Sequence, residues 1–387
     1  MKYPIGIQTF EKIISEGYVY VDKTDMVYSL AHNGSIYFLS RPRRFGKSLL
    51  LSTLENYFLG KKELFKGLFI EQLEKEWKTY PVFHVDFNSE DYTDSDTLNN
   101  AIDSYLCSWE SEYGLTPSAN QSSGRRFANI LGAAHKQTGT RCVVLVDEYD
   151  KPILDVMDSG LFTMVGNNKV TIEDKNRETL KAFYSTFKLA DKDLHFVFLT
   201  GVTKFSQVSI FSGFNQPNDI SMDERYDTLC GMTDEEIDRY FTQTVLELAE
   251  KRKLTVSEAR LALKKRFDGY HFSNRLKGVY NPFSLLNTFN KLAIDDYWFS
   301  TGTPTYLVRL LNHFGEKLND LTDKLYYKSQ FYEFNAVGSH SLPIIYQSGY
   351  LTIKTFDPEN EVYTLDFPNE EVERGFLTLV DSNYFKE

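Results

Sequence analysis

The residues best suited to chemistry lie in the segment SRPRRFGKSLL, residues 40–50. Gly46, Lys47 and Ser48 match the end of the phosphate-loop pattern G-x-x-x-x-G-K-[ST]. Such a loop points backbone N–H groups and the positive end of a helix dipole at one phosphate group. Lys47 would reach the β- and γ-phosphates, and the Ser48 hydroxyl would take one Mg²⁺ coordination site. The pattern asks for glycine at position 41, where this chain has Arg41.

An acidic pair follows a later apolar run, in the segment VVLVDEYD. Asp147 falls where a strand should end and would complete the Mg²⁺ shell opposite Ser48. Glu148 would polarise a water as the general base for attack on the γ-phosphate. Two solvated acids at a strand end are the alternative, and the presence of both motifs favours the nucleotide site.

A third group ends the run LHFVFLTG, where Thr200 is placed to contact the γ-phosphate or to orient the water. Thr203 and Lys204 lie nearby. A hydroxyl that caps the following turn is the competing interpretation for each of these side chains.

The arginines of the loop need an explanation of their own. Pro42 has no N–H, so this loop offers fewer backbone donors than a glycine-rich one. The guanidinium groups of Arg41, Arg43 and Arg44 would replace them with bidentate bonds to phosphate, and one would neutralise γ-phosphate charge as an arginine finger does. A solvated basic rim, or pairing with acids such as Asp150, is the alternative.

The elements that would position these residues are short apolar runs separated by longer helical segments. Near-continuous apolar runs are typical of strands buried on both faces of a parallel sheet. The intervening segments KSLLLSTLENYFLG and NRETLKAFYSTFKLA are long enough for crossover helices. This pattern predicts an α/β, three-layer P-loop NTPase sandwich, with strands at Ser35–Ser40, Pro81–Phe87, Arg141–Glu148 and Leu194–Gly201.

The sequence pattern changes after about residue 225, where helix-like segments replace the short apolar runs. Thr233 and Glu236 stand in the capping-box relation, which predicts the start of a helix. Further helical segments follow, and the tail predicts two strands around the turn DPEN. We therefore expect a P-loop core at 1–225, a helical lid at 226–300 and a winged-helix-like α+β module at 301–387.

Charge and cysteines narrow the function classes. The net charge of −11 argues against nonspecific adhesion to nucleic acid or anionic lipid. The three cysteines are far apart and indicate neither disulfides nor zinc. The chain shows no leader and no membrane-spanning apolar run, so the sequence predicts a cytoplasmic protein.

Several motifs together resemble the bacterial AAA-ATPase-like proteins, from Pro4 to about Glu371. They are PIGIQTFEKI, YVYVDKT, RPRRFGKSLLLSTL, VVLVDEYDKPI, FLTGVTKFSQVSIFSGFN, YNPFSLLN, WFSTGTPTYL and QSGYLTIK. The resemblance implies that R-P-R-R-F-G-K-S is the normal loop form. The implied site residues are Arg41, Arg43, Arg44, Phe45, Gly46, Lys47, Ser48, Asp147 and Glu148; Leu49, next in the helix, joins the expected nucleotide contacts.

The same resemblance implies that in many proteins of this family a nuclease-like domain follows the ATPase module. We expect none in this chain, because no P-D…(D/E)-x-K cluster is visible near its end. The expected cofactors are ATP and Mg²⁺. A protein partner, the fused domain of a longer protein, and an oligomer are all compatible with the sequence.

Three functions follow as hypotheses. The first is a slow Mg²⁺-ATP hydrolase that works as a nucleotide switch between core and lid. The second is a nucleotide-stabilised binding module with negligible turnover. The third is nucleic-acid handling through the winged module, which the acidity and the absence of a basic recognition helix weaken. A small-molecule kinase fits the loop alone, but Asp147 with Glu148 favours hydrolysis.

A few other residues invite a functional interpretation. Asp22 and Lys23 are placed to contact the base or ribose, with a surface turn as the alternative. His271 is an ordinary half-buried histidine or a lid residue that senses nucleotide. His84 and His135 have no ligand-spaced partner. The segment YWFSTGTPTYL suits an interaction surface or core packing equally well.

Overall fold

The structure is a computed structural model that describes residues 1–117, 120–205, 217–299, 309, 321–322, 324–333 and 341–384. Within these residues the largest sheet has five parallel strands in the order β2–β3–β6–β1–β7. Their bounds are β1 Ile36–Ser40, β2 Val82–Asp86, β3 Cys142–Asp147, β6 Leu194–Gly201 and β7 Asn218–Asp219.

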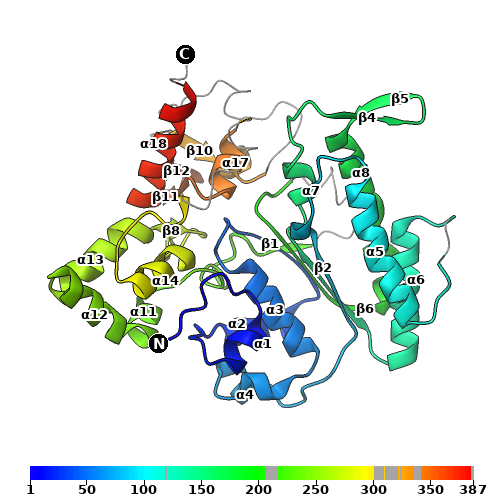
Figure 1. Ribbon diagram of the computed structural model, residues 1–387, viewed down its shortest axis with the longest axis horizontal. Coiled ribbons are helices and arrows are strands. Elements are labelled where there is room, and N and C mark those ends of the chain that lie inside the picture. Colours follow the sequence, from blue (N-terminus) through cyan, green and yellow to red (C-terminus); the bar gives the residue numbers. More distant parts are fainter. Residues whose placement is uncertain are drawn as a thin grey trace.

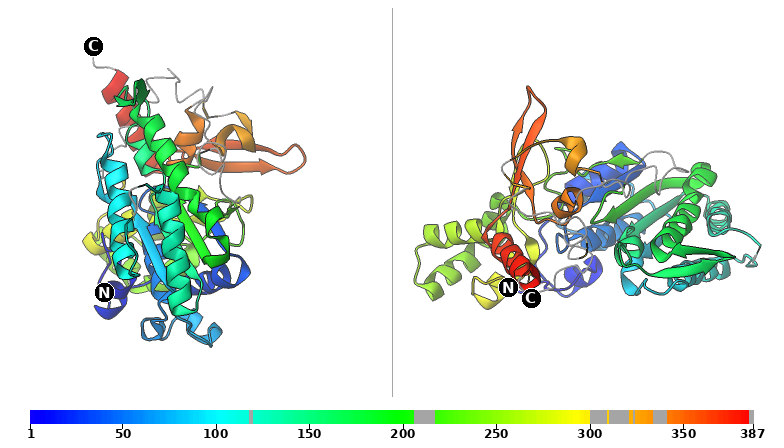
Figure 2. Two further views of the ribbon diagram at one scale, coloured as in Figure 1. Left: turned by 90° about the vertical axis from the view of Figure 1, so that its right-hand side faces the viewer. Right: turned by 90° about the horizontal axis from the view of Figure 1, so that it is seen from above.

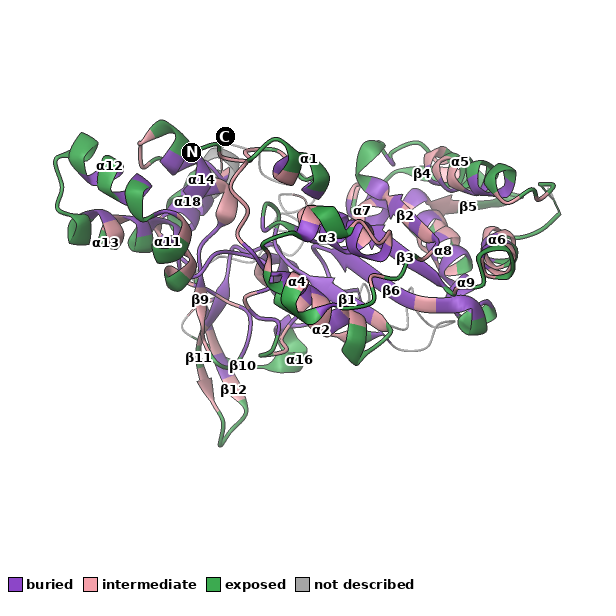
Figure 3. Cartoon of the chain, turned by 90° about the horizontal axis from the view of Figure 1, so that it is seen from below, coloured by how far each residue is buried: buried purple, intermediate pink, exposed green. Residues whose placement is uncertain are grey.

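This sheet confirms the α/β fold class. Every residue of β3 and all but His195 of β6 are buried, as expected for apolar strands that are covered on both faces. Figure 3 shows these strands as the buried centre of the molecule. The four predicted strands agree with the observed ones within one residue at each end, whereas β7 was not predicted.

Helices cover the two faces of the sheet and make three layers (Figure 1). Helix α3 (Lys47–Phe58) packs on one face beside α1 (Phe10–Ser15), α2 (Thr24–Asn33) and α4 (Phe69–Leu73). The other face carries α5 (Thr97–Glu112), α6 (Ser123–Thr138), α8 (Ile172–Tyr184) and α9 (Thr186–Leu189), which pack against one another. Short α7 (Lys151–Leu154) and the hairpin β4–β5 (Phe162–Val165, Asn168–Thr171) precede α8.

A helical group follows the sheet. It contains α11 (Asp234–Tyr240), α12 (Thr242–Arg252), α13 (Val256–Phe267) and α14 (Pro282–Lys291), with the two-residue strands β8 (Tyr270–His271) and β9 (Gly278–Val279). The predicted capping box is confirmed, since Thr233 accepts from the N–H of Glu236 and Glu236 accepts from the N–H of Thr233. The group has its own hydrophobic core, from Met232 to Tyr297.

The C-terminal elements are β10 (Leu325–Tyr327), α16 (Lys328–Phe331), α17 (Leu342–Gln347), β11 (Thr352–Asp357), β12 (Val362–Asp366) and α18 (Glu370–Tyr384). Among the described residues, α16 and α17 lie between β10 and β11, and the order of the three strands in their sheet is β10–β12–β11. The β11–β12 hairpin turns at the predicted DPEN and projects away from the body (Figure 2). Its side chains Ile353, Tyr363 and Leu365 join the same hydrophobic cluster as the central sheet.

Candidate functional site

The phosphate loop joins β1 to α3, as the sequence predicts. Ser40 ends the strand, residues 41–46 form the turn, and Lys47 begins the helix. Gly46, at the N-cap, has φ 90°, in the left-handed region where an L side chain is strained. The glycine therefore allows the backbone to turn directly into the N-terminus of α3, where N–H groups collect.

Lys47 is almost fully buried and lies among acceptors. Its Nζ is 3.2 Å from the carbonyl oxygen of Arg41 and 3.4 Å from that of Pro42. The same Nζ lies 3.4 Å from Oε1 of Glu148. The lysine of the loop and the second acid of the pair therefore meet, although they are far apart in the sequence.

Asp147 and Thr200 are bonded to each other across neighbouring strands. Thr200, near the end of β6, donates its hydroxyl to Oδ1 of Asp147 at 2.7 Å, and the N–H of Glu148 donates to the same oxygen at 3.0 Å. Strand β6 lies between β1 and β3, so it brings Thr200 beside the acidic pair. Glu148 has φ 49°, an uncommon backbone conformation for a non-glycine residue.

Asp150 is a buried acid that sequence reasoning considered only as an arginine partner. Its Oδ2 accepts hydrogen bonds from the N–H groups of Val202 and Thr203, which fixes the loop after β6. Its Oδ1 has no hydrogen-bond partner among the residues that the structure describes. Burial raises the pKa of Asp150 to about 7, and the charge of Glu148 adds to this effect.

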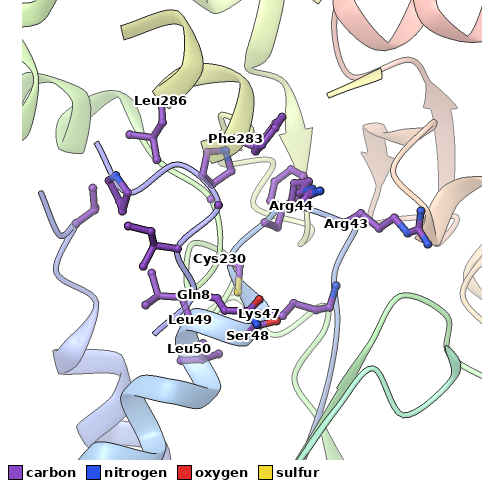
Figure 4. A pocket seen from close by; sticks show the side chains of 18 of the residues that line it. Gln8, Arg43, Arg44, Lys47, Ser48, Leu49, Leu50, Cys230, Phe283 and Leu286 are labelled. Atoms are coloured by element: carbon purple, nitrogen blue, oxygen red, sulfur yellow. The ribbon is translucent and has the colours of Figure 1, made fainter. Parts of the chain in front are cut away.

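Lys47, Ser48 and Glu148 border a cavity of about 420 Å³ between the sheet and the helical group, whereas Asp147, Asp150 and Thr200 are not among its lining residues (Figure 4). This volume is in the range of small-molecule sites. One end is polar and contains Lys47, Ser48 and Glu148. The opposite wall is largely apolar and comes from the N-terminal segment, the segment before α11, the residue between α11 and α12, and α14. Its apolar members are Ile5, Ile7, Val21, Leu229, Met232, Phe241, Phe283 and Leu286.

The three loop arginines separate in the structure. Arg41 is fully buried outside the cavity, and its guanidinium donates to the carbonyl oxygens of Ser40, Ser221 and Tyr226 at 2.9, 2.8 and 3.2 Å. Burial lowers the pKa of Arg41. The expectation that Arg41 contacts phosphate does not fit this position, because its donors face protein carbonyls.

Arg43 and Arg44 are exposed and border the cavity. The Arg44 guanidinium lies 5.0 Å from the ring centre of Phe283. Figure 4 shows the Arg43 side chain reaching away from Ser48. Neither Arg43 nor Arg44 has an ion pair with Asp150 among the described contacts. Of the alternatives to phosphate binding, a solvated basic rim therefore fits Arg43 and Arg44 better than pairing with Asp150.

The other loop residues expected to contact nucleotide, Ser48, Leu49 and Phe45, do not all face the cavity in the same way. Ser48 and Leu49 border the cavity in the first turn of α3. Phe45 also borders it, but the ring is buried edge-on against Tyr270 and Phe272, at 4.7 and 5.4 Å between ring centres. The ring of Phe45 therefore packs against the segment around β8.

Asp22 and Lys23 are neighbours in the sequence, but only Lys23 borders the cavity. Asp22 accepts from the N–H groups of Thr24 and Phe69 and so fixes the starts of α2 and α4. Lys23 borders the cavity and pairs with Glu236, the residue that closes the capping box. Asp22 thus has a structural role in the N-terminal layer.

Thr203 and Lys204 lie away from the cavity. Thr203 is buried, and Lys204 pairs with Asp219 and Glu333, each at 2.8 Å. The N–H of Lys204 also donates to Gln347 at 2.8 Å. The loop after β6 is therefore tied to the C-terminal elements.

The histidines have structural partners. His271 lies on β8, where its ring Nδ1 contacts the carbonyl oxygen of Ile353 at 2.7 Å and burial lowers its pKa. His84 pairs with Glu55 at 3.1 Å and His135 with Asp193 at 2.9 Å. The segment YWFSTGTPTYL lies outside the described residues from position 300 onward.

Some cavity residues were not predicted as a site. Asn88, Lys151 and Asp155 border it near Glu148, and Cys230 borders it from the segment before α11. Asn88 closely follows β2, and in a parallel sheet ligands bind beyond the carboxyl ends of the strands. This position in the sequence could have indicated Asn88 as a site residue. Cys230 carried no comparable signal.

Comparisons with known proteins agree with this geometry. The family described as "Predicted AAA-ATPase" matches residues 4–211. A protein from Azotobacter chroococcum mcd 1, described as an uncharacterized protein in the vnfD 5′ region, is 38% identical over 397 residues. That alignment covers all of this chain and 71% of the relative. The chain belongs to the AAA-ATPase-like family.

A solved structure of the Aeropyrum pernix Orc1 protein in complex with DNA is also similar. The match covers 97% of each chain at 10% sequence identity, with a TM-score of 0.32. A score this low carries no argument about function. Among the described residues, no helix combines the length and apolarity needed to cross a membrane.

Proposed function

We propose that this chain is a Mg²⁺-dependent ATP-binding protein and a slow ATP hydrolase that acts as a nucleotide switch. The observation that carries the proposal is the meeting of Lys47 and Glu148 at the polar end of the cavity, 3.4 Å apart. The Thr200–Asp147 hydrogen bond lies beside them. Contacts thus link the lysine that we propose for phosphate binding, the acid that we propose for water activation and the acid that we propose for the metal shell.

The residues present fit Mg²⁺-ATP. The triphosphate would lie at the N-terminus of α3, a helix of 12 residues whose N-cap is Gly46. Ser48 and Asp147 offer the oxygen ligands that Mg²⁺ prefers. When bound, the metal ion neutralises charge on the β- and γ-phosphates. The apolar wall between the N-terminal segment and α14 would take the base.

The hydrolytic role falls to Glu148. A γ-phosphate would compete with the Glu148 carboxylate for Lys47 Nζ, since both are anions. Once Lys47 turns to the phosphate, Glu148 is released to accept a proton from the attacking water. Thr200 would then act through Asp147, holding its carboxylate in one orientation.

The remaining cofactor contacts are proposed for Arg43, Arg44 and Leu49. Their exposure or position at the cavity edge leaves them accessible to a nucleotide. A guanidinium at this edge would bind phosphate oxygens in a bidentate manner. We therefore propose that Arg43 or Arg44 replaces the donors lost at Pro42, and that Arg41 does not.

The proposed switch depends on three units, at 1–225, 226–300 and 301–387. The separate hydrophobic core of the helical group supports treating it as a lid. Because the cavity is walled by both the sheet side and the lid, a bound nucleotide would hold the two in one relative position. A protein partner or an attached nuclease-like domain would receive that signal.

A binding module with negligible turnover is the second candidate. It is favoured by the same contact, because the Glu148 carboxylate is already occupied by Lys47. Nucleic-acid handling gains no support from the wing, whose tip carries Asp357, Glu359 and Glu361. Acidic side chains there would repel phosphate backbones.

Phosphate release from Mg²⁺-ATP tests the proposal in three proteins: wild type, Lys47→Ala and Glu148→Gln. A hydrolase predicts turnover only in the wild type, with a fall of about 100-fold or more in Glu148→Gln, the scale of general-base catalysis. Equal, negligible rates in wild type and Glu148→Gln, with binding lost only in Lys47→Ala, would leave the binding module as the function.

A further inference from the structure

Five consecutive residues of the phosphate loop, residues 41–45, each contact the helical group or the C-terminal elements. We call residues 41–45 the docking segment. Its members are placed as follows: Arg41 stacks on Phe272, Pro42 lies against Gly349, the Arg43 carbonyl accepts from Trp298, Arg44 lies over Phe283, and Phe45 packs on Tyr270. The five partners are spread from Tyr270 to Gly349, so separate elements converge on one short loop.

These contacts are close. The Arg41 guanidinium lies 4.1 Å from the ring centre of Phe272. The indole N–H of Trp298 donates to the Arg43 carbonyl oxygen at 3.2 Å. Gly349 has φ 87°, and a Cβ there would come within 2.7 Å of two carbons of the Pro42 ring. The loop backbone therefore lies directly on the turn after α17.

The first two residues of the docking segment, Arg41 and Pro42, have few donors left for phosphate. Pro42 has no N–H, and the N–H of Arg41 already donates to the carbonyl oxygen of Gly201 at 3.2 Å. The two terminal NH groups of Arg41 donate to carbonyls, as described above, and its Nε is buried. Residues 43–48 border the cavity, and Lys47 and Ser48 begin α3 after the N-cap Gly46. The loop thus docks through residues 41–45 and faces the cavity through residues 43–48.

The partners of the docking segment are themselves fixed to one another. The N–H of Trp298 donates to Glu371 of α18 at 2.7 Å, and the Ser284 hydroxyl of α14 donates to the same carboxylate at 2.7 Å. The N–H of His271 on β8 donates to the Thr352 hydroxyl of β11 at 2.8 Å. A shift of any one of these elements would therefore displace the others and the loop.

From these contacts we infer that Trp298 and Gly349 are positioning residues for phosphate binding, acting on Lys47 and Ser48 through the docking segment. Neither residue borders the cavity. Trp298 holds the Arg43 carbonyl and Gly349 lies against the Pro42 ring. Lys47 Nζ lies within reach of the carbonyls of Arg41 and Pro42 in the same segment. The inference rests on the proposed ATP site and adds a route by which the C-terminal elements set ATP affinity.

Trp298→Phe keeps a ring at this position and removes the N–H that holds the Arg43 carbonyl. We expect its Kd for Mg²⁺-ATP to rise about two- to tenfold, the range that one lost hydrogen bond gives. Trp109→Phe, in the buried packing of α5 away from the loop, is the matched control. Its Kd should equal that of the wild type, even where its melting temperature falls as far as that of Trp298→Phe.

Gly349→Ala tests the same route by steric pressure on Pro42. Gly139→Ala is its control, because Gly139 also has a left-handed φ of 73° but a Cβ there meets no atom within 4 Å. Both variants carry the strain of a non-glycine residue at positive φ. Only Gly349→Ala should weaken ATP binding; equal Kd values in the two, or an unchanged Kd in Trp298→Phe, would overturn the inference.

Amide hydrogen exchange separates this inference from the proposed function. Faster exchange of residues 43–48 in Trp298→Phe than in Trp109→Phe, measured without nucleotide, is the expected sign of a released loop. If the wild type binds no ATP, the proposed function fails, and the exchange data alone decide whether the loop is docked. Identical exchange in the two variants would contradict the docking.

Discussion

Lys47 is held by three acceptors, two loop carbonyls and the carboxylate of Glu148. Its side chain is 3% exposed, so Lys47 is already stripped of most water, and exchanging one acceptor for another involves little further desolvation. With the proposed nucleotide bound, Lys47 would therefore turn to a phosphate without a large rearrangement of the loop.

Glu148→Gln should therefore bind Mg²⁺-ATP more tightly than the wild type. The neutral amide neither repels the γ-phosphate nor holds Lys47 by charge, and a gain of about 1 kcal/mol, near fivefold in Kd, is the scale of one partly screened charge pair. Titration of a fluorescent ATP analogue measures it. Weaker binding in Glu148→Gln would contradict the competition between Glu148 and phosphate.

Arg41 and Arg43 should differ in what they support. Arg41→Ala removes a fully buried side chain and leaves three carbonyl acceptors without donors, so we expect a loss of roughly 2–4 kcal/mol of stability. Arg43→Ala, at an exposed position, should leave the melting temperature within about 1 °C of the wild type, as surface substitutions usually do. Equal melting temperatures of the two variants would contradict the buried placement of Arg41.

Asp150 should make stability depend on pH. Its folded pKa of about 7 lies above its ordinary value near 3.8, so the folded state holds the proton more tightly. This contribution is fully present below about pH 4 and is lost as the pH rises through about 7. Asp150→Asn is neutral throughout and lacks this dependence.

We expect the fall in melting temperature between pH 5 and pH 8 to be smaller in Asp150→Asn than in the wild type, by roughly 2–8 °C. Part of the fall remains in the variant, because burial also raises the pKa of Glu371 to about 7. Parallel melting curves at both pH values in the two proteins would show that Asp150 is ionised in the fold.

At the scale of elements, the strands were the easiest part to predict. Their apolar runs are local signals in the sequence. The run that ends at Ser40 ends with β1, and the run that leads to Asp147 ends with β3. The order of the strands is not local, because it depends on which strands pair. The placement of Thr200 beside Asp147 follows from β6 lying between β1 and β3.

The direction of Arg41 could not be predicted for the same reason. Its acceptor Ser221 lies 180 residues along the chain, and Tyr226 and Phe272 lie further still. The helix from Thr233 was predicted, but it ends at Tyr240, and α12 begins again at Thr242. The hairpin β4–β5 was also missed, since its strands are short and mostly exposed.

Two capping boxes give a prediction for the helical group: Thr233 with Glu236 at the start of α11, and Thr255 with Glu258 at the start of α13. Thr233→Ala and Thr255→Ala each remove an N-cap acceptor and should cost about 1 kcal/mol of helix stability. Amide exchange in α11 and in α13, respectively, should become faster by about fivefold, which corresponds to that free energy. Unchanged exchange near Glu236 and Glu258 would show that packing alone fixes the two helix starts.

At the scale of the whole molecule, the cavity lies where three parts of the chain meet: the first residues, the sheet side with α3, and the helical group. Tyr3 shows how close these parts are, since its hydroxyl is 2.7 Å from the Thr244 hydroxyl of α12. A ligand in this cavity contacts all three parts, so its binding free energy adds to the stability of the assembled fold.

Thermal melting with and without Mg²⁺-ATP, in wild type and Lys47→Ala, tests the central claim most directly. At an ATP concentration about 100 times its Kd, binding adds about 2.7 kcal/mol of stability, and the melting temperature of the wild type should rise by several degrees. Lys47→Ala should melt at the same temperature with and without Mg²⁺-ATP. No rise in the wild type at millimolar Mg²⁺-ATP, or an equal rise in both proteins, would contradict an ATP site at Lys47.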